Sequence, residues 1–228
     1  KNLIECNAMK SIVNFICKSL VGILTITVGT QALACSTVTN TNDSGLGSLR
    51  EAIICVNSDL SQDQITFNIP SSDVNCSGGI CEILPSDPLP TITDHGVSID
   101  ATTQPGTSCG TSFDGSGTPT NRQLSIQLVG GDAGDAHGFD FQGNDFSLRG
   151  FAIVDFTKGD FAGVNVGGDN GVISCNHIGV EVDGFTDNKN DSGVRIDGGK
   201  NVIIGGSSGS DMNVLSGNNE FGVYVLNA

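Results

Sequence analysis

The sequence predicts an all-β solenoid whose coils each contain three short strands. The tetrapeptide Gly-Val-x-[Val/Ile] recurs at residues 163–166, 179–182, 193–196 and 222–225, and short apolar runs return every 8 to 14 residues. Gly is concentrated in the same region, with 25 of the 32 glycines in residues 101–228. An antiparallel sandwich would also contain short strands, but self-similarity favours stacked coils of roughly 20–30 residues.

The composition excludes several classes of protein. The chain has 228 residues and a formal net charge of −15, from 10 Lys and Arg against 25 Asp and Glu. Nucleic-acid binding requires clustered basic residues, and so does an anionic membrane surface, so neither partner is expected. Gly is costly inside helices, which argues against long helices.

The first 34 residues are predicted to be removed rather than folded. Residues 1–8 precede Met9 and are interpreted as upstream read-through. Residues 9–34 have the basic start, apolar stretch and small-residue end (Ala32-Leu33-Ala34) of a signal peptide. An N-terminal anchor and a lipoprotein site at Cys35 are alternatives, although the apolar run is shorter than the roughly 20 residues that span a bilayer. The mature chain is therefore expected to be exported and not inserted in a membrane.

Six cysteines remain after residue 34, and an even number in an exported chain indicates disulfides. Cys76 and Cys81 can close a small local loop. Cys35 can tie the first strand to the helix that carries Cys55, which leaves Cys109 to pair with Cys175. The sequence does not determine this connectivity.

Residues 35–123 are predicted to form an N-terminal cap with the first coils, followed by the repeats in residues 124–228. Ser48 and Glu51 have the spacing of a capping box, and apolar residues at helical spacing follow as far as Asn57. Arg50 is expected to pair with a neighbouring acid, so both Arg50 and Glu51 are interpreted as structural. Strands are predicted at residues 35–41, 65–69, 80–84 and 97–100, with prolines in the intervening loops.

These residues also resemble a known family. Residues 38–53 (VTNTNDSGLGSLREAI), 65–70 (ITFNIP), 89–93 (LPTIT) and 99–106 (IDATTQPG) are similar to the N-terminal segment of bacterial secreted right-handed parallel β-helix proteins with a Ser-Leu-Arg-Glu-Ala motif. Residues 201–206 and 213–218 are similar to their repeats. Some members have Cys where this chain has Gly47. The resemblance implies a right-handed parallel β-helix with an N-terminal cap containing one short helix.

The resemblance also implies a secreted or cell-surface protein, for which adhesion or carbohydrate contact is the usual supposition. The chain ends at Ala228 within a repeat. A solenoid needs a polar or covered end, so we expect further sequence beyond this point.

Four charged residues are candidates for catalysis if the protein is an enzyme. Arg195 and Asp197 alternate with Val194 and Ile196, and Glu181 and Asp183 alternate with Val180 and Val182. Stacked coils could bring these four side chains to one outward face as a shallow acidic groove. Polysaccharide lyases and glycosidases on this fold use such residues, but fold alone does not establish catalysis.

Asp183, Asp187 and Asp191 lie in one longer corner and could supply oxygen ligands to Ca²⁺. Their spacing matches no known calcium motif, and Asp is an ordinary turn residue, so a solvated loop is the alternative. His137 and His177 lack any accompanying catalytic motif and are interpreted as loop or groove residues. No other cofactor is expected.

The sequence thus favours a non-catalytic, exported, adhesin-like scaffold or stalk that contacts a glycan or another cell surface. The alternative is a carbohydrate-active enzyme acting on an extracellular polysaccharide. Aromatic residues suited to sugar stacking are scarce, with no Trp and one Tyr, and the phenylalanines are assigned to the core. The oligomeric state is not specified by the sequence.

Overall fold

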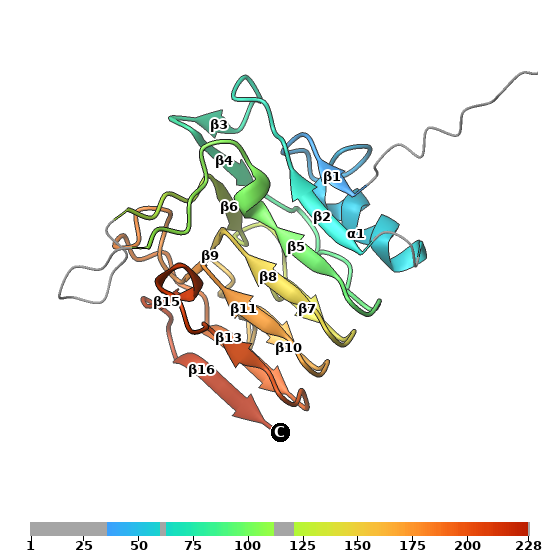
Figure 1. Ribbon diagram of the computed structural model, residues 1–228, viewed down its shortest axis with the longest axis vertical. Coiled ribbons are helices and arrows are strands. Elements are labelled where there is room, and N and C mark those ends of the chain that lie inside the picture. Colours follow the sequence, from blue (N-terminus) through green and yellow to red (C-terminus); the bar gives the residue numbers. More distant parts are fainter. Residues whose placement is uncertain (1–35, 60–62, 112–120, 228) are drawn as a thin grey trace, which may run out of the picture. The chain divides into compact units, whose positions relative to one another are not determined.

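The computed structural model describes residues 36–59, 63–111 and 121–227, all of which belong to one compact unit. The predicted read-through and signal peptide lie outside these residues. The unit is mostly β-structure with one α-helix, as the sequence predicted, and its strands form three sheets (Figure 1). Among the described residues, no helix is long and apolar enough to cross a bilayer.

Sheet A and sheet B have six strands each, and sheet C has four. In spatial order, sheet A contains β1 (Thr37–Val38), β2 (Gln64–Phe67), β5 (Ser98–Asp100), β8 (Ser147–Arg149), β11 (Val172–Ser174) and β14 (Ile203–Ile204). Sheet B contains β15 (Val214–Leu215), β12 (His177–Ile178), β9 (Phe151–Val154), β6 (Ile126–Val129), β4 (Ile80–Ile83) and β3 (Cys76–Ser77). Sheet C contains β16 (Phe221–Leu226), β13 (Ser192–Asp197), β10 (Ala162–Val166) and β7 (Phe139–Phe141).

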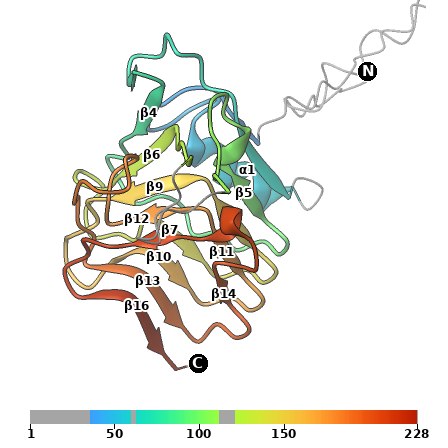
Figure 2. The ribbon, with the colours of Figure 1, turned by 60° about the vertical axis from the view of Figure 1, so that its left-hand side comes forward.

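From β5 onward the chain visits the three sheets in turn, so neighbours within a sheet there come from successive passes (Figures 1 and 2). Apart from the β3–β4 hairpin, the named strands pair in parallel. Hydrogen-bonded side chains on successive passes are 25 residues apart at Asn165 and Asp140, and 31 apart at Asn201 and Asn170. Other register partners are farther apart, with 37 residues between His177 and Val214 and 49 between Ser98 and Ser147, so the predicted coil of roughly 20–30 residues fits only some of the passes.

Single residues with left-handed backbone turn the corners between sheets. Gly150 alone joins β8 to β9 with φ +89°, and a Cβ there would lie 2.7 Å from the backbone nitrogen of Thr102. Asn170 and Asn201 also have positive φ, and the side chain of Asn201 donates to that of Asn170. Asn and Gly tolerate this conformation best, which confirms their predicted role at corners.

Apolar side chains from all three sheets fill the interior. The largest fully buried residues include Phe67 of β2, Phe139 of β7 and Phe151 of β9. The Phe151 ring lies 5.3 Å from that of Phe67 and 5.2 Å from that of Phe139, in edge-to-face contact. This confirms the predicted core role for these phenylalanines. Phe185 and Phe221 are exceptions, with 72% and 45% of their surface exposed.

Helix α1 (Leu49–Ser58) lies where it was predicted, with Leu49, Ala52, Ile53 and Val56 buried. The Ser48 hydroxyl accepts from the Glu51 amide, but the Ser48 amide donates to the Gly45 carbonyl. A capping box also requires the Glu51 side chain to accept from the Ser48 amide. This part of the prediction is wrong, because the Ser48 amide already donates to the Gly45 carbonyl of the preceding turn.

Arg50 fixes the loops around the helix. Its guanidinium forms an ion pair with Asp43 at 2.7 Å and also donates to the backbone carbonyls of Asp87 and Pro88. Burial alone would raise the pKa of Asp43, but hydrogen bonds from Arg50 and Ser86 lower it. The structural interpretation of Arg50, including its acidic neighbour, is confirmed.

Two of the predicted disulfides are present, Cys76–Cys81 and Cys109–Cys175. The first closes the β3–β4 hairpin, and the second joins the loop after β5 to the residue that follows β11. Cys35 lies outside the described residues, so its pairing with Cys55 stays a prediction. Disulfides are compatible with an extracellular location.

Candidate functional site

A groove of about 870 Å³ runs over the outward face of sheet A. Side chains alternate along each strand, so Ile99, Leu148 and Ile173 face the core while their neighbours face outward. The outward residues form two rows across the strands. One row is Ser98, Ser147, Val172 and Ile203, and the other is Asp100, Arg149 and Ser174.

The segment after β14 forms one wall of the groove through Gly205, Gly206, Ser207 and Asp211. It includes the 3₁₀ turn η2 (Gly209–Asp211), in which the Ser208 amide donates to the Asp211 carboxylate. Hydrogen bonds from Ser208, with a smaller contribution from the Arg149 charge, lower the pKa of Asp211. Asp211 is therefore an ionised acceptor beside the groove at neutral pH.

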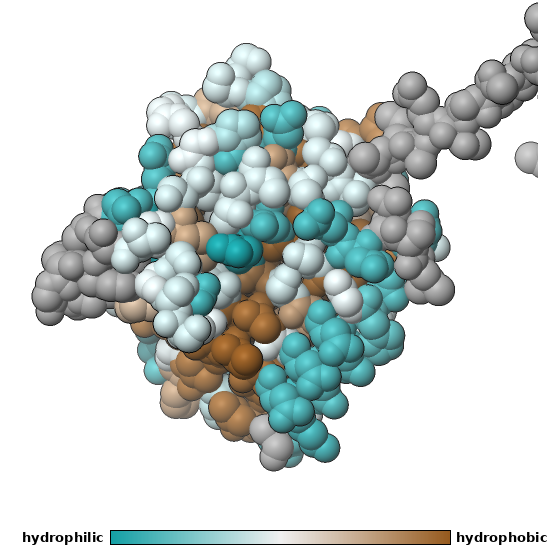
Figure 3. Space-filling view, viewed as in Figure 1, coloured by the Kyte–Doolittle hydropathy of each residue, from teal (hydrophilic) through white to brown (hydrophobic). Residues whose placement is uncertain are grey.

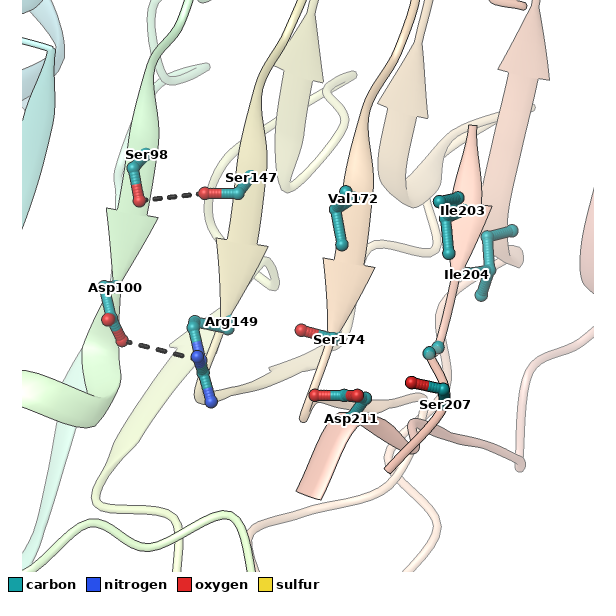
Figure 4. Close-up of a pocket in the computed structure, with 12 residues that line it drawn as sticks. Ser98, Asp100, Ser147, Arg149, Val172, Ser174, Ile203, Ile204, Ser207 and Asp211 are labelled. Carbon is teal, nitrogen blue, oxygen red and sulfur yellow. Dashed lines mark hydrogen bonds and ion pairs between the residues drawn. The ribbon is translucent and has the colours of Figure 1, made fainter. Parts of the chain in front are cut away.

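The groove is polar at one end and apolar at the other (Figure 4). Arg149 lies between Asp100 on one side and Ser174 and Asp211 on the other, whereas Val172 and Ile203 form an apolar strip. Ile204 is the register partner of Ile173 and packs against the core at the edge of the groove. Figure 3 shows apolar surface over the lower part of this face, bordered on one side by hydrophilic residues. Ile203 is 53% exposed in β14, the last strand of sheet A within the described residues.

Among the charged side chains that line the groove, Arg149 has the fewest close contacts to other polar groups. Its Nε lies 3.9 Å from Asp100 Oδ1, and its Nη2 donates to Cys109 Sγ at 3.3 Å. Asp100 instead accepts hydrogen bonds from the amide and hydroxyl of Thr102. A guanidinium has five donor hydrogens, and the one on Nε of Arg149 is buried without a hydrogen-bond partner. The side chain is 37% exposed, so the remaining donors on its Nη atoms are the ones open to a ligand.

The four candidate catalytic residues lie in two different elements. Arg195 and Asp197 are on the outward face of β13, as predicted, and form an ion pair at 3.0 Å. Glu181 and Asp183 instead follow β12 in a loop closed by a bridge between Val180 and Asp187. Within residues 36–59, 63–111 and 121–227, no hydrogen bond or ion pair joins one pair to the other.

Residues 179–182 therefore match the repeated tetrapeptide without forming a strand. The sheet C strand of that pass is β13, which begins at Ser192. The insertion of a loop between β12 and β13 places Glu181 and Asp183 away from the position that their sequence pattern indicated.

Two of the three predicted calcium ligands, Asp183 and Asp191, accept hydrogen bonds from protein groups, and Asp187 forms a backbone bridge with Val180. The Asp183 carboxylate accepts from the Phe185 amide and from the amide and hydroxyl of Thr186, and these hydrogen bonds lower its pKa. Asp191 accepts from the Asn219 side chain. In the described part of the chain, no group of three His, Cys, Asp or Glu side chains has a metal-binding arrangement.

His177 is a buried strand residue rather than a loop or groove residue. It is 3% exposed in β12, its Nδ1 lies 3.0 Å from the Glu181 carbonyl, and its Nε2 is buried without a partner. Burial lowers the pKa of His177 to about 4.

This burial predicts a pH-dependent stability. An unfolded His titrates near pH 6.5, so between about pH 6.5 and 4 only the unfolded state takes up the proton. The His177 contribution to the unfolding free energy, about 3 kcal/mol, is complete above pH 6.5 and is lost as the pH falls to 4. Urea unfolding at pH 7 and pH 4.5 measures the loss. A His177→Gln variant should lose less stability over this range, and an equal loss would contradict the assignment.

Comparison with known proteins assigns neither a family nor a function to this chain. No protein-family model, curated protein or solved structure matches the chain. The functional argument therefore depends on the geometry of the chain itself.

Proposed function

We propose that this protein is an exported, non-catalytic scaffold that contacts an extracellular glycan through the groove over sheet A. The observation that carries the proposal is the combination of Arg149, Asp100, Asp211 and a serine row with an adjacent apolar strip. Sugars present hydroxyl groups on their edges and apolar C–H groups on their faces. A groove with a few placed polar groups beside apolar surface suits such a ligand.

The proposal includes the finer architecture. Parallel strands of one sheet joined by crossover connections are right-handed almost without exception. Three parallel sheets visited in turn support a right-handed parallel β-helix, in which the outward faces are long and regular. Such a scaffold displays side chains from successive coils about 4.8 Å apart, which suits an extended polymeric ligand. The disulfides and the signal-peptide pattern support export to the cell surface or the medium.

The experiment is affinity electrophoresis of the protein through gels that contain neutral or uronate polysaccharides. We expect at least one polysaccharide to retard the protein. Arg149→Ala should weaken this interaction about 10- to 100-fold, because hydrogen bonds from a charged donor contribute about 1.5–3 kcal/mol. Lys158→Ala is the matched control, since it removes one positive charge from an exposed residue outside the groove.

Two results would contradict the proposal. If the wild type and Arg149→Ala are retarded equally, the glycan contact lies elsewhere on the protein. If no polysaccharide retards the protein, the proposed glycan contact is wrong. The same polysaccharides are assayed for new reducing ends and unsaturated uronides. Product formation would favour the alternative, a carbohydrate-active enzyme.

A further inference from the structure

The outward face of sheet C carries a second row of polar and aromatic side chains. Asp140 of β7, Asn165 of β10, Arg195 of β13 and Tyr224 of β16 are register partners across four neighbouring strands (Figure 2). Val164 and Val194, their strand neighbours, are fully buried. The four row residues therefore project from the opposite side of the sheet.

Two aromatic rings meet at the end of this row. The rings of Phe221 and Tyr224 are stacked, with centroids 4.8 Å apart and planes 16° from parallel. Phe221 is 45% exposed and Tyr224 is partly exposed. Because the two rings lie face to face, each covers one side of the other, and the exposed part of Phe221 is the aromatic surface open to a ligand. The scarcity of aromatic residues in the sequence did not predict this surface.

Charged groups beside the rings are held in place. Arg195 donates from Nη2 to Asp197 Oδ2 at 3.0 Å and from Nη1 to the Asp160 carbonyl at 3.2 Å. Asp197 also accepts from the Asn227 side chain at 3.1 Å, and this hydrogen bond, together with the hydrogen bond and the positive charge of Arg195, lowers the pKa of Asp197. The Arg195 and Asp197 side chains are 23% and 37% exposed, so both an ionised acceptor and a guanidinium are accessible.

The row also contains an unsatisfied polar group. Asn165 is 8% exposed, and its Nδ2 donates to Asp140 Oδ1 at 2.8 Å, whereas its Oδ1 is buried without a partner. Buried polar atoms in folded proteins usually have a protein or water partner. Its neighbour in the row, Arg195, has a buried Nε that also lacks one.

We infer that this face is a second sugar-binding surface, separate from the groove over sheet A. A pyranose ring stacks through its C–H face on the exposed side of the Phe221 ring, and its hydroxyls bind Arg195 and Asp197. The ligand class rests on the proposed function, but the residues do not overlap those of the groove. A protein with sugar-binding surfaces on two sheets bridges two glycan chains, and such bivalence strengthens attachment without new contacts.

The single tyrosine makes the test specific. The chain has one Tyr and no Trp, so its intrinsic tyrosine fluorescence reports on Tyr224 alone. The 228-residue chain is titrated with cellohexaose, maltohexaose, chitohexaose and hexagalacturonate. We expect at least one of them to change the fluorescence in a saturable way. Phe221→Ala should weaken that binding about 2- to 10-fold, the size of one aromatic pair interaction. Phe185→Ala removes a more exposed ring from the loop between β12 and β13 and should have no effect.

Each other outcome overturns a defined part of the account. If no oligosaccharide changes the tyrosine fluorescence, the second surface is overturned, whether or not the gels show Arg149-dependent retardation. If such retardation is seen, the groove stands alone; if neither signal appears, both surfaces are overturned. A fluorescence response that Arg149→Ala abolishes shows one shared site and also overturns the inference. Independence is expected instead, with the same dissociation constant in wild type and Arg149→Ala.

Discussion

Phe151→Ala is expected to lower the free energy of unfolding by about 3–5 kcal/mol, the usual cost of truncating a buried aromatic ring. Phe151 is fully buried and touches the rings of Phe67 and Phe139, so it joins side chains from all three sheets. Loss of this ring leaves a cavity at the centre of the stack. Urea denaturation followed by circular dichroism measures the change.

Phe185→Ala is the matched control for this prediction. Phe185 is 72% exposed, so its replacement should change stability by no more than about 0.5 kcal/mol. A similar loss in both variants would mean that Phe151 does not occupy the core position assigned to it.

The second large effect is expected from the disulfide between Cys109 and Cys175. These residues are 66 apart in sequence, and closing a loop of that length restricts the unfolded chain by about 4 kcal/mol. Replacing both cysteines with alanine should therefore lower the midpoint of urea unfolding strongly. The loop also holds Cys109 against Arg149, so the same variant should weaken glycan retardation.

The hairpin disulfide provides the comparison. Cys76 and Cys81 are only 5 residues apart, and the same relation gives about 2 kcal/mol for their double replacement. A loss for the Cys76 and Cys81 variant that equals or exceeds that of the Cys109 and Cys175 variant would contradict the expected dependence on loop length.

Local sequence patterns predicted much of the fold. Apolar residues at helical spacing after Ser48 located α1, and the Gly-Val-x-[Val/Ile] repeats at residues 163, 193 and 222 fall in three neighbouring strands of sheet C. These features depend on residues within a few positions of each other. The same reasoning failed at residue 179, because a pattern of four residues does not reveal that the chain leaves the sheet there.

The groove was missed for a different reason. Asp100 and Arg149 are almost 50 residues apart and meet only because β5 pairs with β8 in one particular register. A signal was present, since residues 98–100, 147–149 and 172–174 each place one apolar residue between two outward ones. Alignment of these tripeptides would have predicted both rows, but it requires knowing which strands are neighbours.

The two exposed phenylalanines show a similar limit. Phe221 was assigned to the core because Phe is usually buried. In the structure its ring stacks on that of Tyr224 and is 45% exposed, which the usual burial of Phe does not predict.

The most direct test of the central claim uses isoleucine methyl groups in NMR spectra. Ile203 is 53% exposed and faces the groove, whereas Ile54 is 43% exposed on α1 and serves as the control. Addition of a polysaccharide fragment that retards the protein should shift the methyl signals of Ile203 and leave those of Ile54 unchanged. Saturable binding without any shift at Ile203 would contradict the assignment of the groove as the glycan-contacting surface.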